Sequence, residues 1–362
     1  MDMLSRQKRY YTLHSRLASL SNDALLEKIK AAPHTKGWGL NHTLELDGTS
    51  IFVKRIPLTE KEFAQLHDTQ NLFDLPMHYH YGMGSAGFGA FREWLTHIKT
   101  TDWVLSGEQV HFPLLYHYRI LHSQASWKVW DSEKMDGYCT YWNDNGSIRE
   151  YTQARMEAPY EIALFLEHIP HSLYTWFKAP SFPKFTQLVQ EARDALTFLQ
   201  AQGILHMDAH LANLLTDGEH CYVSDFGLAL DRQFAIDQEE LAFFETHQDY
   251  DQGQLTCCTG LILLSGFEIL EKEKQKHILQ AFDLPSDTDK NDRNRRFIEE
   301  LEHLNTGGLE LPKEHFRYLQ KHRTQILYMM DFYHHLHEDS KKELRFDRNL
   351  LKSGKLPEGN QA

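Results

Sequence analysis

The sequence predicts an α+β fold of two lobes, a small β-rich N-terminal lobe followed by a mainly helical C-terminal lobe. Three patterns favour it: a β-hairpin pattern over residues 42–56, an apolar strand pattern over 161–167, and helical periodicity over 185–201 and again from about 250. The chain has 362 residues. Because a domain commonly takes roughly 100–200 residues, this length allows two lobes with a substantial core.

Composition and charge argue against several kinds of protein. The formal net charge is −13, and an acidic surface repels a phosphate backbone, so we expect no nucleic-acid partner. The four cysteines form no CxxC pair, which argues against a zinc site or a disulfide framework. No signal-peptide pattern opens the chain, and the longest apolar run, residues 255–267, is shorter than the roughly 20 residues that span a bilayer. We therefore expect a cytoplasmic protein without a membrane span, with 255–267 as a buried helix.

The first part of the chain shows a helix signal. Ser21-Asn22-Asp23 precedes apolar residues at helical spacing, which is typical of a helix start. We expect four parts in order: an N-terminal helical extension (1–34), an N-lobe with inserts (35–169), a helical C-lobe (170–352) and a flexible tail (353–362).

The next element is a hairpin. Asp47-Gly48 lies between two β-rich runs, and such a pair predicts a tight two-residue turn. Side chains alternate along a strand, so Lys54 shares a face with the apolar Phe52 and Ile56. This lysine either extends its ammonium group to water or is held there to bind an anion.

A glycine-rich segment follows an irregular insert at 57–81. Residues 82–89 contain the string GxGxxG and precede a helix at 90–99. The string alone is a weak signal, so the segment is either a flexible linker or a loop that contacts phosphate. Further strands are expected at 127–130 and 137–142.

The middle of the chain alternates strand and helix. The apolar run 161–167 predicts a strand, and a short helix is expected around 172–177. Residues 185–201 carry an apolar stripe at helical spacing, and Gly203 is well placed to end that helix.

Oxygen-bearing side chains gather in the segment 203–230. Two short β runs, 214–216 and 221–223, flank an Asp-Gly turn and predict a second hairpin. Folding that hairpin brings Asn213 beside Asp225, with Asp208 in the preceding loop at the same edge. Oxygen ligands that converge in this way suit magnesium together with phosphate oxygens.

This segment resembles the protein kinase superfamily. The resemblance is carried by His206-Met207-Asp208 with Asn213 five residues on, and then by Asp225-Phe226-Gly227. The strand with Lys54 is similar to the family's ATP-lysine strand, and the apolar strand 161–167 is similar to the one that leads into the adenine-binding hinge. The resemblance covers about residues 35–230.

The resemblance implies ATP and Mg²⁺ as cofactors and a role for each residue. Asp208 would accept the proton of the acceptor hydroxyl, within a catalytic loop completed by His206 and His210. Asn213 and Asp225 would bind the metal. The remaining residues would bind the nucleotide: Lys54 with its partner Glu93 at the phosphates, and Glu167, His168 and Ile169 at the adenine.

The sequence departs from the family in three places. His210 stands where typical protein kinases have lysine and looks like the aminoglycoside and choline kinase branch. No APE motif follows the Asp225 segment. The glycine string at 82–89 lies after Lys54, whereas the family has it before; Gly37-Trp38-Gly39 has the expected place but is too short.

We therefore expect an ATP- and Mg²⁺-dependent kinase that transfers the γ-phosphate to a hydroxyl acceptor. The Asp-Phe-Gly motif and the hinge favour a protein Ser/Thr acceptor. One alternative is a small-molecule phosphotransferase of the aminoglycoside or choline type, which His210 favours. A second alternative is a pseudokinase that binds nucleotide as a scaffold.

Glu93 either faces solvent or faces a polar cleft with Lys54, and the cleft is favoured because no nearby helix offers a better acid.

Overall fold

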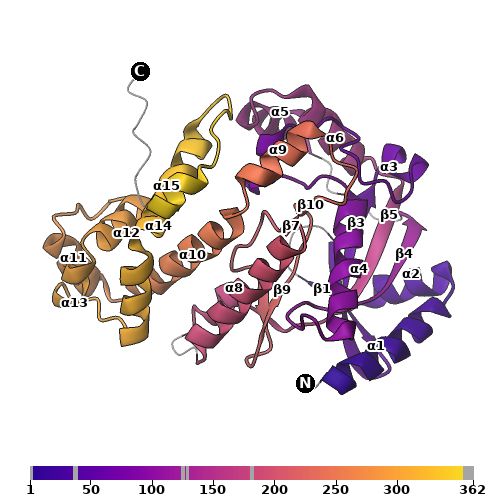
Figure 1. Cartoon of the computed structure of the whole chain (residues 1–362), viewed down its shortest axis with the longest axis horizontal. Helices are drawn as coiled ribbons and strands as arrows, with labels where there is room; N and C mark the ends of the chain where they lie inside the picture. The colour runs from indigo at the N-terminus through magenta and orange to yellow at the C-terminus, as the bar shows by residue number, and fades with distance from the viewer. Residues whose placement is uncertain (1–2, 36–39, 124–126, 128–129, 180–182, 354–362) are drawn as a thin grey trace.

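The computed structural model describes residues 3–35, 40–123, 127, 130–179 and 183–353. The fold is α+β: an antiparallel sheet lies in the N-terminal half, and mainly helices follow in the C-terminal half (Figure 1). The described α-helices are α1 (Met3–Ala18), α2 (Asn22–Ala31), α3 (Glu60–Ala64), α4 (Ala90–Ser106), α5 (Ser132–Tyr141), α6 (Gly146–Met156), α7 (Leu173–Trp176), α8 (Phe185–Ala201), α9 (Gln238–Thr246), α10 (Tyr250–Leu263), α11 (Lys272–Ala281), α12 (Lys290–Glu299), α13 (Leu301–Thr306), α14 (Lys313–Glu338) and α15 (Arg348–Ser353).

The larger sheet has the strand order β1-β2-β3-β5-β4. Its strands are β1 (His34–Thr35), β2 (Leu40–Leu46), β3 (Thr49–Leu58), β4 (Leu115–His122) and β5 (Tyr160–Glu167). The predicted hairpin is confirmed: β2 and β3 pair across Asp47 and Gly48, whose φ angles of +49° and +75° suit a tight hairpin turn. The predicted apolar strand is β5, which lies between β3 and β4 and is buried on both faces over residues 161–167.

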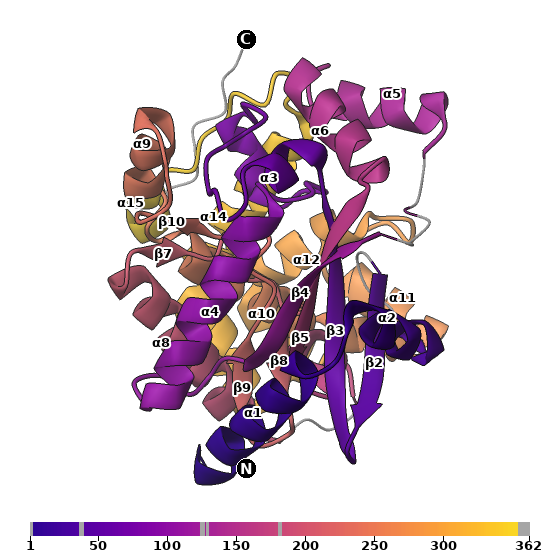
Figure 2. The ribbon, with the colours of Figure 1, turned by 90° about the vertical axis from the view of Figure 1, so that its right-hand side faces the viewer.

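The N-terminal helices pack against this sheet. Figure 2 shows α1 running beside β4, and α2 lying near β2. Ser21 caps α2 as predicted, because its side chain accepts a hydrogen bond from the Ala24 N–H. Helix α1 lies within the N-terminal segment expected to be helical, and few of its side chains are buried, one of them the charged Arg6.

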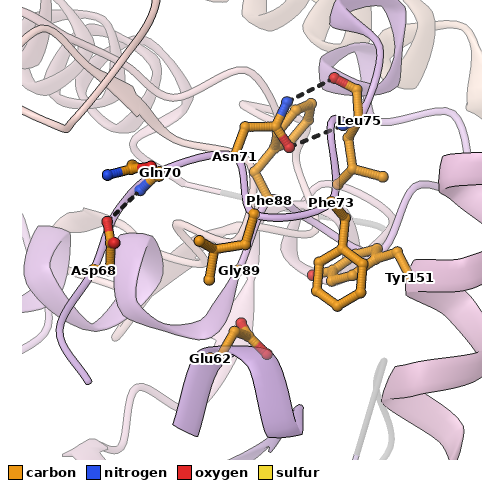
Figure 3. A pocket seen from close by; sticks show the side chains of 10 residues that line it. Glu62, Asp68, Gln70, Asn71, Phe73, Leu75, Phe88, Gly89 and Tyr151 are labelled. Atoms are coloured by element: carbon orange, nitrogen blue, oxygen red, sulfur yellow. Dashed lines mark hydrogen bonds between the residues drawn. The ribbon is translucent and has the colours of Figure 1, made fainter. Parts of the chain in front are cut away.

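The insert before α4 is compact. It comprises α3, the 3-10 helix η1 (Met77–Tyr81) and the turns between them. The Asn71 side-chain amide donates a hydrogen bond to the Leu75 carbonyl at 2.8 Å, and its oxygen accepts one from the Leu75 N–H at 2.9 Å (Figure 3). The cavity at this place has about 10 Å³, room for roughly one water molecule, so it is a packing gap with no space for a ligand.

The strand predicted over 137–142 is wrong. Residues 132–141 form α5, which begins at an Asp131 cap whose side chain accepts from the Lys134 N–H. The aromatic residues there suggested a strand, but Tyr138 and Trp142 lie four residues apart and so share a helix face. Trp127 and Trp130 are not in a strand, and residues 128–129 of that predicted strand lie outside the described residues.

The C-terminal half is built on helices that pack against two small sheets. One sheet has the order β6-β8-β9 and the other pairs β10 with β7; their strands are β6 (His171–Ser172), β7 (Ile204–Leu205), β8 (Leu214–Thr216), β9 (Cys221–Val223) and β10 (Leu230–Asp231). Helix α8 has the predicted bounds, and Gly203 follows its end with φ +81°. The apolar run at 255–267 lies largely in α10, which is buried as predicted and packs along α14. None of the described helices is long and apolar enough to cross a membrane.

Candidate active site

Two of the predicted site residues meet at one end of the second hairpin. Strands β8 and β9 pair with Leu214 opposite Val223, and just beyond this pair the Ser224 N–H donates to the Asn213 carbonyl at 3.0 Å. Asn213 and Asp225 are therefore neighbours at the same sheet edge. The structure brings these two residues together as the hairpin pattern predicts.

Lys54 reaches this edge from β3. Its Nζ atom lies 2.7 Å from Oδ1 of Asp225 and 2.6 Å from Oε1 of Glu93. Glu93 is buried in the first turn of α4, so it faces Lys54 and not solvent. The favoured pairing of these two residues is present, and the ammonium group is held between carboxylates instead of extending to water.

The three charges shift each other's protonation. Burial alone would lower the pKa of Lys54, but the carboxylates of Asp225 and Glu93 outweigh it and raise the pKa above its usual value. The partial burial of Asp225 likewise opposes its ionisation, yet the Lys54 ammonium lowers the pKa of Asp225 to about 2. Burial raises the pKa of Glu93, and Lys54 offsets that only in part. Lys54 and Asp225 are thus a firmly charged pair.

Asp208 lies in the loop before the hairpin, next to Asn213. The Asn213 Nδ2 group donates to both the carbonyl and the Oδ2 atom of Asp208, each at 2.9 Å. His210 Nε2 lies 3.6 Å from the same Oδ2. The Oδ1 atom of Asp208 is buried and has no hydrogen-bond partner among the described residues. Burial raises the pKa of Asp208 to about 6, although His210 counteracts it.

The loop is held in an unusual backbone conformation. Met207 and Asp225 have φ angles of +63° and +64°, a region that non-glycine residues seldom adopt. The Asp251 carboxylate of α10 holds one of these turns by accepting from the His206 and Met207 N–H groups at 2.7 and 2.8 Å. Sequence reasoning missed Asp251. The available signal was an acidic residue in the first turn of an otherwise apolar helix.

His206 joins the loop to the strand that leads to Asp225. Its Nδ1 accepts from the Asp208 N–H at 3.2 Å, so its Nε2–H donates to the Ser224 carbonyl at 2.9 Å. Burial lowers the pKa of His206 to about 4, which keeps the ring neutral at pH 7. His206 is therefore a structural member of the loop.

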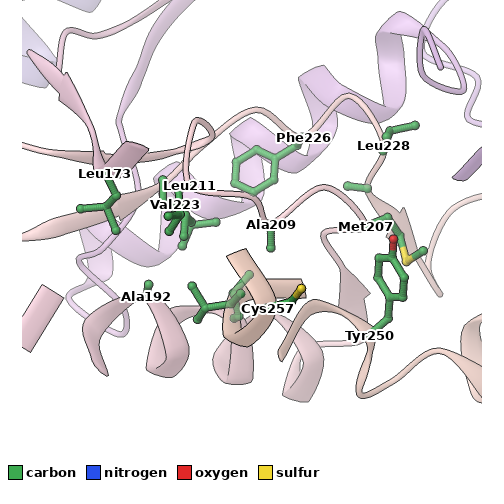
Figure 4. Packing of buried hydrophobic residues seen from close by; sticks show 14 of the residues in the cluster. Leu173, Ala192, Met207, Ala209, Leu211, Val223, Phe226, Leu228, Tyr250 and Cys257 are labelled. Carbon is green, nitrogen blue, oxygen red and sulfur yellow. The ribbon is translucent and has the colours of Figure 1, made fainter. Parts of the chain in front are cut away.

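Apolar residues support the loop from below. Met207, Ala209 and Leu211 alternate with the polar loop residues, and they point toward the helices on which the loop rests (Figure 4). Phe226 is fully buried, and its ring contacts His97 and His206 at centroid distances of 4.8 and 5.3 Å. This packing fixes the residue next to Asp225.

The predicted adenine-binding residues lie at the end of β5. The Glu167 side chain is already used: its Oε2 accepts from Nη2 of Arg6 at 2.6 Å and its Oε1 from Nε of Arg6 at 3.2 Å. Its backbone N–H donates to the Leu114 carbonyl at 2.8 Å. His168 and Ile169 follow and are partly exposed. The Glu167 side chain is thus bonded to Arg6, and the placement of adenine beside Glu167, His168 and Ile169 stays a prediction.

The glycine-rich segment touches the site. Gly82 lies against the Asp208 carboxylate, and Gly87 lies against the Gly227 carbonyl. Gly37 and Gly39, the other candidate for a phosphate loop, lie outside the described residues.

The oxygen donors suit a hard cation. No group of three or more His, Cys, Asp or Glu side chains gathers as a metal site within the described residues. Asp225 nevertheless has a 40% exposed carboxylate with Lys54 on one oxygen, and Asn213 stands beside it. One carboxylate plus an amide oxygen is a donor set that fits Mg²⁺ bound mainly through phosphates and water.

Comparison with known proteins adds no relatives. No model of a known protein family matches the chain, and no curated protein sequence matches it.

Proposed function

We propose that this chain is a phosphotransferase with a two-lobed, protein-kinase-like fold that binds ATP with Mg²⁺ and transfers the γ-phosphoryl group to a hydroxyl. The main support is the contact of Lys54 with both Glu93 and Asp225, next to the bonded pair of Asp208 and Asn213. These five residues come from β3, α4 and the loop and hairpin after α8, far apart in sequence.

Each residue then has a chemical task. Lys54 carries the positive charge that a nucleotide phosphate requires, and Glu93 keeps it in place. Asp225 and Asn213 would hold Mg²⁺, which neutralises phosphate charge when bound. The adenine would lie beside the partly exposed His168 and Ile169.

Asp208 is the group that receives the proton. As the acceptor oxygen bonds to the γ-phosphorus, the bond from that phosphorus to the bridging oxygen breaks, and ADP leaves. The acceptor's O–H gives its proton to the Asp208 carboxylate. With a pKa of about 6, Asp208 is mostly ionised at pH 7 and above, and it is still basic enough to hold a proton briefly.

A protein Ser/Thr residue is the first acceptor class that we propose. A small-molecule alcohol is the second candidate, because His210 Nε2 lies 3.6 Å from the Asp208 carboxylate and is positioned to contact a compact acceptor. A nucleotide-binding scaffold without turnover is less favoured, since Lys54, Asp208, Asn213 and Asp225 are all present.

The test is transfer of labelled γ-phosphate from Mg-ATP. The wild type is compared with Asp208→Ala and Asp225→Ala, and with Asp194→Ala as a control. Asp194 lies in α8, where its carboxylate accepts a hydrogen bond from Gln190 at 2.7 Å. We expect the wild type and the Asp194→Ala control to transfer phosphate, and both site variants to have lost this activity. A protein that binds nucleotide but transfers phosphate equally well with and without Asp208 would contradict the proposal. The identity of the labelled acceptor decides between a protein and a small molecule.

A further inference from the structure

The loop from Gly82 to Gly87 approaches the proposed site too closely for any side chain. Gly82 has φ +68°, and a Cβ atom placed on it would lie 2.6 Å from Oδ1 of Asp208. Gly87 has φ +90°, and its Cβ would lie 2.5 Å from the carbonyl oxygen of Gly227. Both contacts are closer than a Cβ atom tolerates, so a side chain at either position would have to displace the atom that it meets.

The loop is held in one conformation by tyrosines. The Ala86 N–H donates to the hydroxyl oxygen of Tyr79 at 2.9 Å, and the Tyr138 hydroxyl donates to the Gly84 carbonyl at 3.0 Å. The Tyr79 and Tyr138 hydroxyls are themselves 2.7 Å apart. This network ties the tip of the loop to η1 on one side and to α5 on the other.

The base of the loop is closed by stacked rings. His80 and Phe88 stack with centroids 3.6 Å apart and planes 7° from parallel. The hydroxyl group of Tyr81, the residue before Gly82, lies 2.7 Å from Nε2 of His247. The same hydroxyl oxygen accepts a hydrogen bond from the Phe346 N–H at 3.1 Å. Both ends of the loop are therefore anchored, one of them by the C-terminal segment before α15.

We propose that Gly82 is a positioning residue for phosphoryl transfer and that loop 82–87 is a fixed wall beside Asp208. This inference rests on the proposed function of Asp208. Gly82 covers Oδ1, the oxygen without a hydrogen-bond partner, and so prevents the carboxylate from turning toward the loop. Oδ2, next to Asn213 and His210, is then the oxygen that takes the acceptor's proton. The acceptor hydroxyl arrives from the His210 side.

The same contacts assign the glycine string a role other than gripping phosphate. The two glycines that fit tightly lie against Asp208 and Gly227, and the atoms nearest to a Cβ on either of them belong to Asp208, Leu228 and Gly227. A wall that orients the proton acceptor changes the rate of transfer. A phosphate clamp would instead change the affinity for nucleotide.

The first test separates rate from affinity in Gly82→Ala. Mg-ATP binding is measured by calorimetry, and turnover is measured as ATP hydrolysis with water as the acceptor. We expect binding within about twofold of wild type and turnover at least about tenfold lower, because small misplacements of a catalytic group have large effects on rate. Gly107→Ala is the matched control: its φ is +80°, nothing lies within 4 Å of its Cβ, and it lies outside the site. Weakened Mg-ATP binding by Gly82→Ala, or turnover equal to that of the control, would contradict the proposed positioning role of Gly82.

A second test needs no turnover. The urea midpoints of unfolding are compared for wild type, Gly82→Ala, Asp208→Ala and the double variant. Substitutions at two residues in contact have effects on stability that do not simply add. The new methyl group collides with a carboxylate that Asp208→Ala has removed, so Gly82→Ala should lower the midpoint less in that background. If Gly82→Ala alone does not fold, folding of the double variant supports the contact. An equal loss in both backgrounds, or no folding in either, contradicts it.

The two proposals fail in different ways. A wild-type protein that neither binds Mg-ATP nor hydrolyses it overturns the proposed function. An active wild type whose Gly82→Ala variant is equally active overturns only the role of the wall.

Discussion

Arg92 of α4 and Glu240 of α9 form an ion pair in which each side chain is only 1% exposed, with Nη1 and Oε1 2.6 Å apart. The Nε group of Arg92 also donates to the Thr69 carbonyl at 2.8 Å. Arg92 precedes Glu93, the partner of Lys54, so this pair fixes the helix turn that carries Glu93. The segment after Gly227 is thereby attached to α4 through the ion pair of Arg92 and Glu240.

Glu240→Gln should destabilise the protein strongly. The substitution leaves a buried guanidinium group without a full counter-charge, and breaking such a pair commonly costs about 3–5 kcal/mol. The free energy of unfolding in urea measures the loss. Glu245→Gln in the same helix is the control: Glu245 pairs with Arg232 near the surface, with exposures of 45% and 51%, and its loss should cost at most about 1 kcal/mol. Similar losses in both variants would contradict the structural role of the buried pair.

Arg6→Met should also destabilise the fold by about 3–5 kcal/mol, because it leaves the buried Glu167 carboxylate without its cation. Adding Glu167→Gln to Arg6→Met removes the unpaired charge and should restore part of the loss. Arg16→Met, in the same helix but paired with the exposed Asp47, should change the unfolding free energy by at most about 1 kcal/mol. Urea unfolding of the wild type and these three variants checks this, and no recovery in the double variant would argue against a charge effect.

These ion pairs show where sequence reasoning stops. The hairpin at Asp47-Gly48, helix α8 and the second hairpin with Asn213 and Asp225 were predicted because each is encoded by neighbouring residues. Arg6 and Glu167 lie 161 positions apart, and no local spacing connects them. Glu167 was placed near the adenine because its strand resembles the one that leads into a kinase hinge, and nothing in the local sequence pointed to Arg6 as its partner.

The candidate site was predicted more completely than the fold around it. Lys54, Glu93, Asp208, Asn213 and Asp225 do converge, since the motif spacing and the hairpin fix most of their positions. The support of the loop was not foreseen, because the contacts of Asp251 and Gly82 depend on tertiary packing. A glycine string alone does not tell which neighbour it approaches.

Acidification should destabilise the protein between pH 6.5 and about 4. Burial lowers the pKa of His247 to about 4, and its Nδ1–H donates to the Phe243 carbonyl, so its neutral Nε2 accepts from the Tyr81 hydroxyl. An unfolded histidine titrates near about 6.5, so only the unfolded state gains a proton as the pH falls through this range. Stability present above pH 6.5 is then lost, at up to about 1.4 kcal/mol per pH unit for this one group.

Unfolding free energies at pH 7.0, 6.0 and 5.0 measure this slope. His247→Gln should be less stable at pH 7.0, because the Tyr81 contact is disturbed, but its stability should depend less on pH than that of wild type. His334→Gln is the matched control for the substitution itself, since His334 is 60% exposed on α14. Buried His97 and His206 shift in the same direction and keep part of the slope in every variant. A wild-type slope retained in full by His247→Gln would exclude His247 as a source.

Lys54→Met should separate nucleotide chemistry from folding in the proposed site. The substitution leaves the buried Glu93 beside Asp225 without a cation, so the pKa of Glu93 should rise further and Glu93 can become protonated, which limits the loss of stability. Phosphoryl transfer has no such relief, since the positive charge at the phosphates is gone, and it should fall at least about 100-fold. Lys61→Met is the matched control: Lys61 is half-exposed, pairs with Glu150 and lies away from the site, so transfer should be unchanged. Labelled γ-phosphate transfer and urea unfolding are measured on both variants. A Lys54→Met protein that folds and transfers phosphate normally would rule out Lys54 as the phosphate-binding lysine.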